Sequence, residues 1–296
     1  MNYAEKRTLQ VKLRPYLFIA PAFIFMLFVF AYPIGDLLRR STNRQYGGEM
    51  EYIGLEAFRL TFRDDFFWTS LFNNLRLFLA VPILVVLSLI FATLIFERLP
   101  AWRIHRTLVF IPYVMAVPVV GVVFTYILTL NGVMNTILER VGLDFIALDW
   151  LGSSKTAIWA IMAVIIWKEL GFGIVLFLAR MSSISVELYD AAKLDGASWW
   201  QEMRHVTIPQ TATVIEFYVV ISMITMLSWV FAYILVMTKG GPGGSTWVME
   251  YYIYQKAFQY SQMHIAAAAS VLLLVFAGVL MVVQGRLRRE LGGLDG

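Results

Sequence analysis

The chain has 296 residues, a mean hydropathy of +0.70 and 15% charged residues, whereas soluble domains carry roughly 25% charge. This composition predicts one membrane domain. The sequence has no cysteine, which excludes disulfides, thiol catalysis and Cys-ligated metals. Its three histidines (His105, His205 and His264) lack the spacing of metal ligands, and its net charge of +4 requires no nucleic-acid partner. We therefore expect neither a metal nor a nucleic acid.

Six stretches are long and apolar enough to cross a bilayer as helices, which takes about 20 residues. The first is too long for the core of a signal peptide, so we interpret it as an uncleaved helix. We predict an all-α integral membrane domain over residues 15–285, flanked by cytoplasmic segments 1–14 and 286–296. The predicted spans are 15–35, 77–96, 107–138, 156–178, 217–238 and 265–285.

The distribution of Lys and Arg predicts the orientation of these spans, because cytoplasmic loops carry an excess of both. With the N-terminus inside, the inner segments hold thirteen of these residues and the outer segments nine. The short connection at 97–106 is basic (Arg98, Arg103, Arg106) and is the strongest evidence, whereas Arg39-Arg40 on the outer side is a mild violation. We predict that both termini are cytoplasmic.

A loop rich in charged residues, 187–209, joins the fourth and fifth spans; we call it the charged loop. Helix formers over 187–194 are followed by Gly196, which suits the left-handed end of a helix. Ser198 and Gln201 then fit a capping box. The loop therefore predicts two short helices with a bend at 195–197. Such a pair either lies on the inner membrane surface or docks against another protein.

The charged loop resembles the EAA loop of ABC importer permeases. The matching residues are Asp190-Ala191-Ala192, Asp195-Gly196-Ala197 and Ile208-Pro209. Asp190 stands where that family usually has Glu, and Met203 where Phe is typical. In that family the loop is the coupling helix that fits a cleft in a cytoplasmic ATPase. The resemblance implies ATPase contacts for Glu187, Asp190, Ala191, Ala192, Asp195, Gly196, Ala197 and Pro209.

The resemblance extends over roughly residues 15–285, through "YIGLEAF", "DDFFWTSLFNN", "NGVMNTILERVGL", "WLGSSKTAIWA" and "MTKGGPGGSTWVMEYYIYQKAF". It implies the first of two permease subunits in a carbohydrate importer of the maltose and glycerol-3-phosphate type. The implied partners are a second permease subunit, two ATPase subunits and an extracytoplasmic solute-binding protein. The implied location is the plasma membrane of a bacterium or archaeon. We expect no enzymatic activity and no cofactor on this chain, with ATP and Mg²⁺ on the ATPase.

A glycine-rich stretch, 240–246, follows the fifth span; we call it the glycine loop. It lacks the Lys that follows the glycines of a phosphate-binding P-loop. We interpret it as a flexible turn on the outer side, which is compatible with a loop that faces a binding protein.

Polar residues within spans are costly and usually face a cavity or a partner helix. Lys168 and Glu169 point about 100° apart on a helix, so we expect them to pair elsewhere in the bundle or Lys168 to extend outward, if they do not meet solute. In the fifth span, four residues share one helical face: Tyr218, Ser222, Thr225 and Trp229. This face either packs against other helices or contacts solute. The positions of these residues resemble the sugar-contacting region of maltose-type permeases. The candidate solute path comprises Trp167, Lys168, Glu169, Phe172, Tyr218, Ser222, Thr225 and Trp229.

Two other functions compete with an ATP-driven importer. An ion-coupled secondary transporter of a small polar solute would explain charges within a span, but no inverted repeat is evident and the charged loop would be unexplained. A small-solute channel would need a repeated filter motif, and none is evident. The residues that we single out therefore favour the permease of an ATP-driven importer for a sugar or sugar-like solute.

Overall fold

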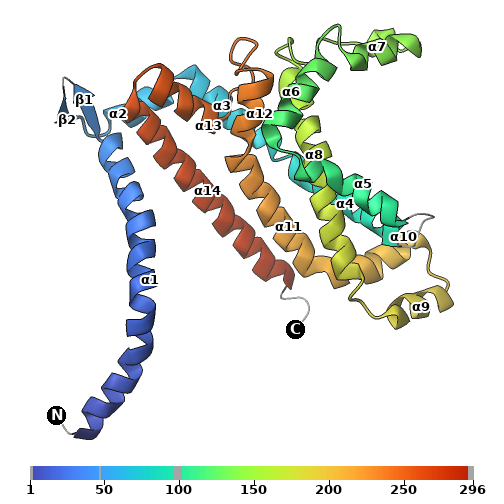
Figure 1. Ribbon diagram of the computed structural model, residues 1–296, viewed down its shortest axis with the longest axis horizontal. Helices are drawn as coiled ribbons and strands as arrows, with labels where there is room; N and C mark the ends of the chain where they lie inside the picture. Colours follow the sequence, from blue (N-terminus) through green and yellow to red (C-terminus); the bar gives the residue numbers. More distant parts are fainter. Residues whose placement is uncertain (1–2, 47, 97–101, 293–296) are drawn as a thin grey trace. The chain divides into compact units, whose positions relative to one another are not determined.

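A computed structural model describes residues 3–46, 48–96 and 102–292 of the chain (Figure 1). The predictions that involve Arg98, the first two residues and the last four residues lie outside this part. The described chain is mostly helical and forms two compact units. The first unit comprises Met1–Arg63 and Ile253–Val275, and the second comprises Asp64–Tyr252 and Phe276–Gly296.

The first unit contains the long first helix and the only departure from an all-helical fold among the described residues. A two-stranded antiparallel hairpin follows the helix, with Asn43 opposite Tyr52. Its turn includes Gly48 at a φ of +93°, a conformation that glycine adopts without steric cost. Each strand has only four residues, too few for a strand pattern to be evident in the sequence. Its elements are α1 (Tyr3–Ser41), β1 (Asn43–Tyr46), β2 (Glu49–Tyr52) and α2 (Glu56–Phe62).

The second unit holds most of the remaining helices. Its chain order is α3 (Asp65–Leu77), α4 (Ala80–Phe96), α5 (Trp102–Val114), α6 (Val117–Leu128), α7 (Val133–Arg140), a 3-10 turn (Asp144–Ile146), α8 (Ala157–Met181), α9 (Val186–Leu194), α10 (Trp199–Glu202), a π-helical turn (Met203–Thr207), α11 (Ile208–Ser228) and α12 (Val230–Met237). Two elements are divided between the units, α13 (Met249–Tyr254) and α14 (Met263–Gly292), and a second π-helical turn (Gln255–Gln259) belongs to the first unit.

Six helical stretches of the described chain are long and apolar enough to cross a membrane, in agreement with the predicted number. Several differ from the predicted bounds: the first ends at Ser41 and not at 35, and the second begins at Asp65 and not at 77. The third predicted span is divided between α5 and α6, because the extended backbone of Ala116 (φ −63°, ψ 135°) interrupts it. The apolar helix at the fifth span begins at Trp199, before the predicted start at 217, and ends at Ser228, before the predicted end at 238.

Helix α8 is the centre of the second unit. It packs along α4 and α5, and α11 crosses the same region (Figure 1). Glycine permits the closest approaches: a Cβ at Gly171 would collide with the Val109 carbonyl of α5, and one at Gly173 with Ser88 of α4. Helices α7 and α9 lie at opposite ends of α8 (Figure 1). The charged loop is therefore presented at one end of this bundle.

Candidate functional site

The charged loop folds as the two short helices that its sequence predicts. Helix α9 begins after Ser185, whose hydroxyl accepts a hydrogen bond from the Glu187 N–H at 3.3 Å. Beyond its end lies Gly196, which has a φ of +75° and donates its N–H to the Lys193 carbonyl at 3.1 Å. Because only glycine adopts this conformation readily, Gly196 sets the bend.

The second helix of the charged loop is the start of a longer one. The Ser198 N–H donates to the Gln201 side-chain oxygen at 2.7 Å, in the predicted capping box. From Trp199 the chain stays helical through the π-helical turn and into α11. Pro209 lies in the first turn of α11, which begins at Ile208. Proline lacks an N–H and crowds the preceding turn, and a wider π-helical turn before it relieves both problems.

Several apolar side chains of the charged loop are exposed. Leu194 is 89% exposed and Trp200 is 65% exposed, and Val186 and Leu188 are also exposed. Large apolar side chains that cluster at one exposed site are typical of a binding surface. The candidate ATPase-contact residues also reach the surface here: Glu187, Asp190, Ala191, Asp195, Gly196 and Pro209 are exposed, and Ala192 and Ala197 are half-buried.

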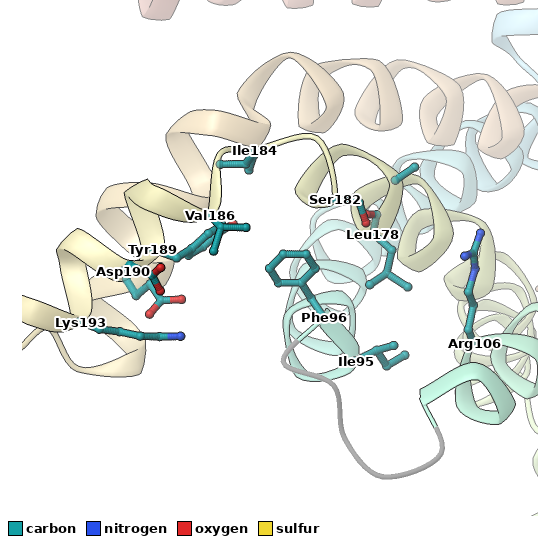
Figure 2. Close-up of a pocket in the computed structure, with 12 residues that line it drawn as sticks. Ile95, Phe96, Arg106, Leu178, Ser182, Ile184, Val186, Tyr189, Asp190 and Lys193 are labelled. Carbon is teal, nitrogen blue, oxygen red and sulfur yellow. The ribbon is translucent and has the colours of Figure 1, made fainter.

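A cavity of about 580 Å³ separates α9 from the ends of α4 and α8 (Figure 2). Asp190 and Lys193 extend toward it from α9, and Arg106 lines it from α5. Tyr189 crosses part of the gap, because its ring centroid lies 5.6 Å from that of Phe96. Burial raises the pKa of the Tyr189 hydroxyl above its usual value. This aromatic contact links α9 to the end of α4.

Lys168 and Glu169 contact each other within α8, and the expectation that they would not is wrong. The Lys168 ammonium lies 3.4 Å from a Glu169 carboxylate oxygen and donates to the Tyr113 carbonyl at 3.1 Å. Lysine has a long flexible stem, so its ammonium reaches around the helix although the two Cβ atoms diverge. Lys168 is only 5% exposed. Its charge is therefore satisfied by groups of this chain.

The two candidate aromatics of α8 lie in different surroundings. The exposed Trp167 ring is 4.9 Å from the Phe124 ring, and it lines a cavity of about 450 Å³ with other aromatic side chains. Phe172 is half-buried and stacks on Tyr113 at 5.0 Å. Of the two rings, Trp167 is the one open to a ligand in this chain.

The polar face of α11 is divided between the interior and the surface. Tyr218 is 1% exposed, and its hydroxyl donates to the Glu169 carbonyl at 3.3 Å. Ser222 is also buried, and the Thr225 hydroxyl donates to its own helix at Ile221 at 3.0 Å. Trp229 is 62% exposed. Tyr218, Ser222 and Thr225 thus make the internal contacts of packing residues, and Trp229 faces outward.

The glycine loop is not the flexible turn that its composition suggests. The Asn73 side chain donates to the carbonyls of Ser245 and Trp247 at 2.7 and 2.8 Å. The Asn74 side-chain oxygen accepts from the Met249 N–H at 2.8 Å. Their signal in the sequence is "FNN", two adjacent asparagines within an apolar helix.

These features define a polytopic α-helical membrane protein with broken spans and a bent, exposed loop at one end. Residues 57–291 match the family model described as "Binding-protein-dependent transport system inner membrane component". The chain belongs to this family and is therefore a membrane subunit of a transport system.

Individual relatives are similar over nearly the whole chain. The chain is 33% identical over 281 residues to the probable ABC transporter permease protein YurN of Bacillus subtilis, covering 93% of this chain and 96% of that protein. It is 28% identical over 286 residues to the arabinooligosaccharides transport system permease protein AraP of the same organism, covering 95% and 90%.

A solved structure has the same fold. A chain of a bacterial alginate ABC transporter, in complex with an alginate pentasaccharide-bound periplasmic protein, matches with a TM-score of 0.82 and 25% identity, covering 96% of this chain and 97% of that chain. The family match and this likeness favour a permease of an ATP-driven importer over an ion-coupled transporter.

Proposed function

We propose that this chain is one of two permease subunits of an ATP-driven importer for a carbohydrate. The family match carries the transport role. The similarity to AraP and to the alginate transporter supports an oligosaccharide as solute. The partners are then a second permease, two ATPase subunits that bind ATP and Mg²⁺, and a solute-binding protein outside the membrane. Both termini lie in the cytoplasm, which puts the charged loop on the ATPase side.

The charged loop docks the ATPase. The observation that carries this proposal is the exposed apolar surface of Leu194 and Trp200 on a loop whose bend is held by Gly196. Because α10 continues without interruption into α11, a displacement of the loop is transmitted directly to the fifth span. Such rigid-body movement of helices about a central site is the usual basis of alternating access.

The solute path runs along the α8 and α11 faces that carry Trp167 and Trp229. Both rings are exposed in this chain and offer the apolar platform that a sugar ring requires. Behind them, the Tyr218 hydroxyl bonds to Ser88 of α4 and to the Glu169 carbonyl of α8, and Ser222 is buried. Lys168 and Phe172 contact Tyr113 of α5, and Glu169 pairs with Lys168. Thr225 is half-buried, and its hydroxyl is bonded to its own helix. In this arrangement the buried residues shape the path and the exposed aromatics contact the solute.

Gly196→Pro tests the docking proposal. Proline requires a φ near −65°, far from the +75° at Gly196, and removes the N–H that ends α9. We expect the variant to insert into the membrane but to lose both co-purification of the ATPase and uptake of an arabino-oligosaccharide into proteoliposomes.

Gly142→Pro is the matched control for this test. Gly142 follows α7 with a φ of +77°, and its N–H also donates to a helix carbonyl, that of Glu139, at 3.1 Å. We expect this variant to retain the ATPase. Retention of the ATPase and of uptake by Gly196→Pro would contradict docking through the charged loop. The unmodified protein could also retain the ATPase, with or without solute, and yet take up no saccharide. That result would contradict only the choice of solute.

A further inference from the structure

The interruption between α5 and α6 leaves a backbone acceptor without its helical donor. In a continuous helix the Tyr113 carbonyl would accept from the N–H of Val117, four residues on. The extended backbone at Ala116 prevents this, and Pro118 has no N–H to offer to the Val114 carbonyl. At membrane depth an unpaired backbone carbonyl is costly, so non-helical backbone there requires a partner from the protein or from water.

Lys168 supplies that partner from the neighbouring helix. Its ammonium donates to the Tyr113 carbonyl at 3.1 Å and lies 5.2 Å from the centroid of the Tyr113 ring. The carbonyl end of a helix carries partial negative charge, so the C-terminus of α5 favours a cation at this place. The nearby Glu169 carboxylate, at 3.4 Å, balances the charge. Three kinds of interaction therefore hold one ammonium at the interruption.

The surrounding packing keeps the ammonium there. Gly171 brings the backbone of α8 against the Val109 carbonyl of α5, in a space that would not admit a Cβ. Phe172, one residue further on, stacks on Tyr113 at 5.0 Å. Since Lys168 is only 5% exposed, water does not replace its contacts. The end of α5 is thus fixed to one turn of α8, the turn that also carries Trp167.

We propose that Lys168 is a positioning residue for transport: its ammonium caps the C-terminus of α5 and thereby fixes the direction in which α6 leaves the interruption. Lys168 does not contact solute. It acts through the backbone of Tyr113, and Glu169 acts through Lys168. This role rests on the proposed transport function only for its kinetic consequence, because the fixed geometry is a property of this chain.

The geometry is measured directly by a distance between spin labels on α5 and α6. The natural chain has no cysteine, so Leu108→Cys and Val122→Cys introduce a unique pair at exposed positions on either side of the interruption. In the full transporter we expect one narrow distance distribution. Lys168→Met keeps the length of the side chain but removes the donor and the charge. We expect it to broaden the distribution and to add a second population.

Lys155→Met is the matched control, because it makes the same chemical change at an exposed position of the loop before α8. It should leave the distribution narrow. In proteoliposomes we expect Lys168→Met to lower the maximal uptake rate by about tenfold or more, consistent with the loss of a charge-assisted hydrogen bond, with the solute KM changed less than about twofold. A residue that contacts solute would instead raise the KM.

A narrow, unshifted distribution in Lys168→Met would overturn the proposal, whatever the uptake result. If that variant does not assemble, Glu169→Gln decides the question. It keeps the lysine but removes its counter-charge, and we expect a smaller broadening; an unchanged distribution would equally overturn the proposal. Failure of the proposed transport function would show differently, as absence of uptake in the unmodified protein with the narrow distribution intact.

Discussion

The charged loop and the glycine loop both connect helices of the second unit, but they differ in the burial of their apolar side chains. The charged loop leaves Leu194 and Trp200 exposed, and a ring contact of Tyr189 joins α9 to α4. The chain that follows the glycine loop buries Trp247 and Val248, and two asparagines of α3 bind its backbone.

This difference separates a loop built to bind a partner from one that completes its own fold. Exposed apolar area has no stabilising partner within the chain, so it gains free energy only when another surface covers it. The glycine loop is bound within this chain by hydrogen bonds, which are stronger where they are buried. Substitutions in the charged loop should therefore affect assembly, and those around the glycine loop should affect the stability of this chain.

The largest effect is expected from Asn73→Leu. The change leaves the part-buried Ser245 carbonyl and the buried Trp247 carbonyl without their side-chain donor, at about 1–3 kcal/mol for each unpaired group. Thermal unfolding in detergent should show a lower Tm. Asn131→Leu, at an exposed asparagine after α6, should change the Tm little. Equal Tm values for both variants would mean that the glycine loop is not held as the structure indicates.

The next effect concerns Glu250 and pH. Burial raises the pKa of its carboxyl from 4.5 to about 7, against a partly opposing hydrogen bond from Asn74. The folded state therefore holds a proton more tightly than the unfolded state, and this contribution is complete below pH 4.5 and lost as the pH rises to about 7. At about 1.4 kcal/mol for each pKa unit, the loss is at most about 3 kcal/mol.

The measurement is the Tm between pH 5 and pH 8, with about 3 kcal/mol as the upper limit of the change. We expect the Tm of the unmodified protein to fall over this range and Glu250→Gln to flatten the profile. Glu139→Gln, at an exposed position of α7, should leave the fall in place. A profile that Glu250→Gln does not alter would show that this carboxylate is already charged in the folded protein.

The sequence predicted the charged loop better than the glycine loop, for a physical reason. The bend at Gly196 and the capping box at Ser198 depend on neighbours within four residues, so local chemistry determines them. The glycine loop is bonded to Asn73, which is 172 residues away from Ser245. No local pattern in a glycine-rich stretch reports such a contact.

The spans show the same limit. Their number followed from apolar length, which is a property of each segment. The Lys168–Glu169 contact did not follow from the sequence. A helical wheel gives the directions of the Cβ atoms, but it does not give the position of the ammonium at the end of a flexible lysine side chain. The interruption between α5 and α6 has a signal in Pro112 and Pro118, although both lie within one apolar stretch.

A moderate effect, on assembly alone, is expected from Trp200→Ala. A buried tryptophan at the centre of an interface contributes about 2 kcal/mol or more to binding, which corresponds to roughly thirtyfold in affinity. ATPase retained on the purified permease should fall accordingly, with an unchanged Tm. Trp159→Ala, at another exposed ring, on α8, should retain the ATPase. A lower Tm in Trp200→Ala without loss of ATPase would mean that the charged loop stabilises this chain and does not bind the ATPase.

The smallest effect is expected at Asp190, an exposed carboxylate on the α9 face that lines the cavity with Lys193. An ion pair at an exposed position contributes about 0.2–1 kcal/mol, so Asp190→Asn should weaken ATPase binding by less than about tenfold. Raising the salt concentration should remove the difference between the variant and the unmodified protein, because salt screens exposed charges. Asp190→Glu keeps the charge and adds one methylene, so binding should stay near the unmodified value. Equal weakening by Asn and Glu, insensitive to salt, would mean that the ATPase recognises the shape of this side chain, and the charged loop would then bind chiefly through Leu194 and Trp200.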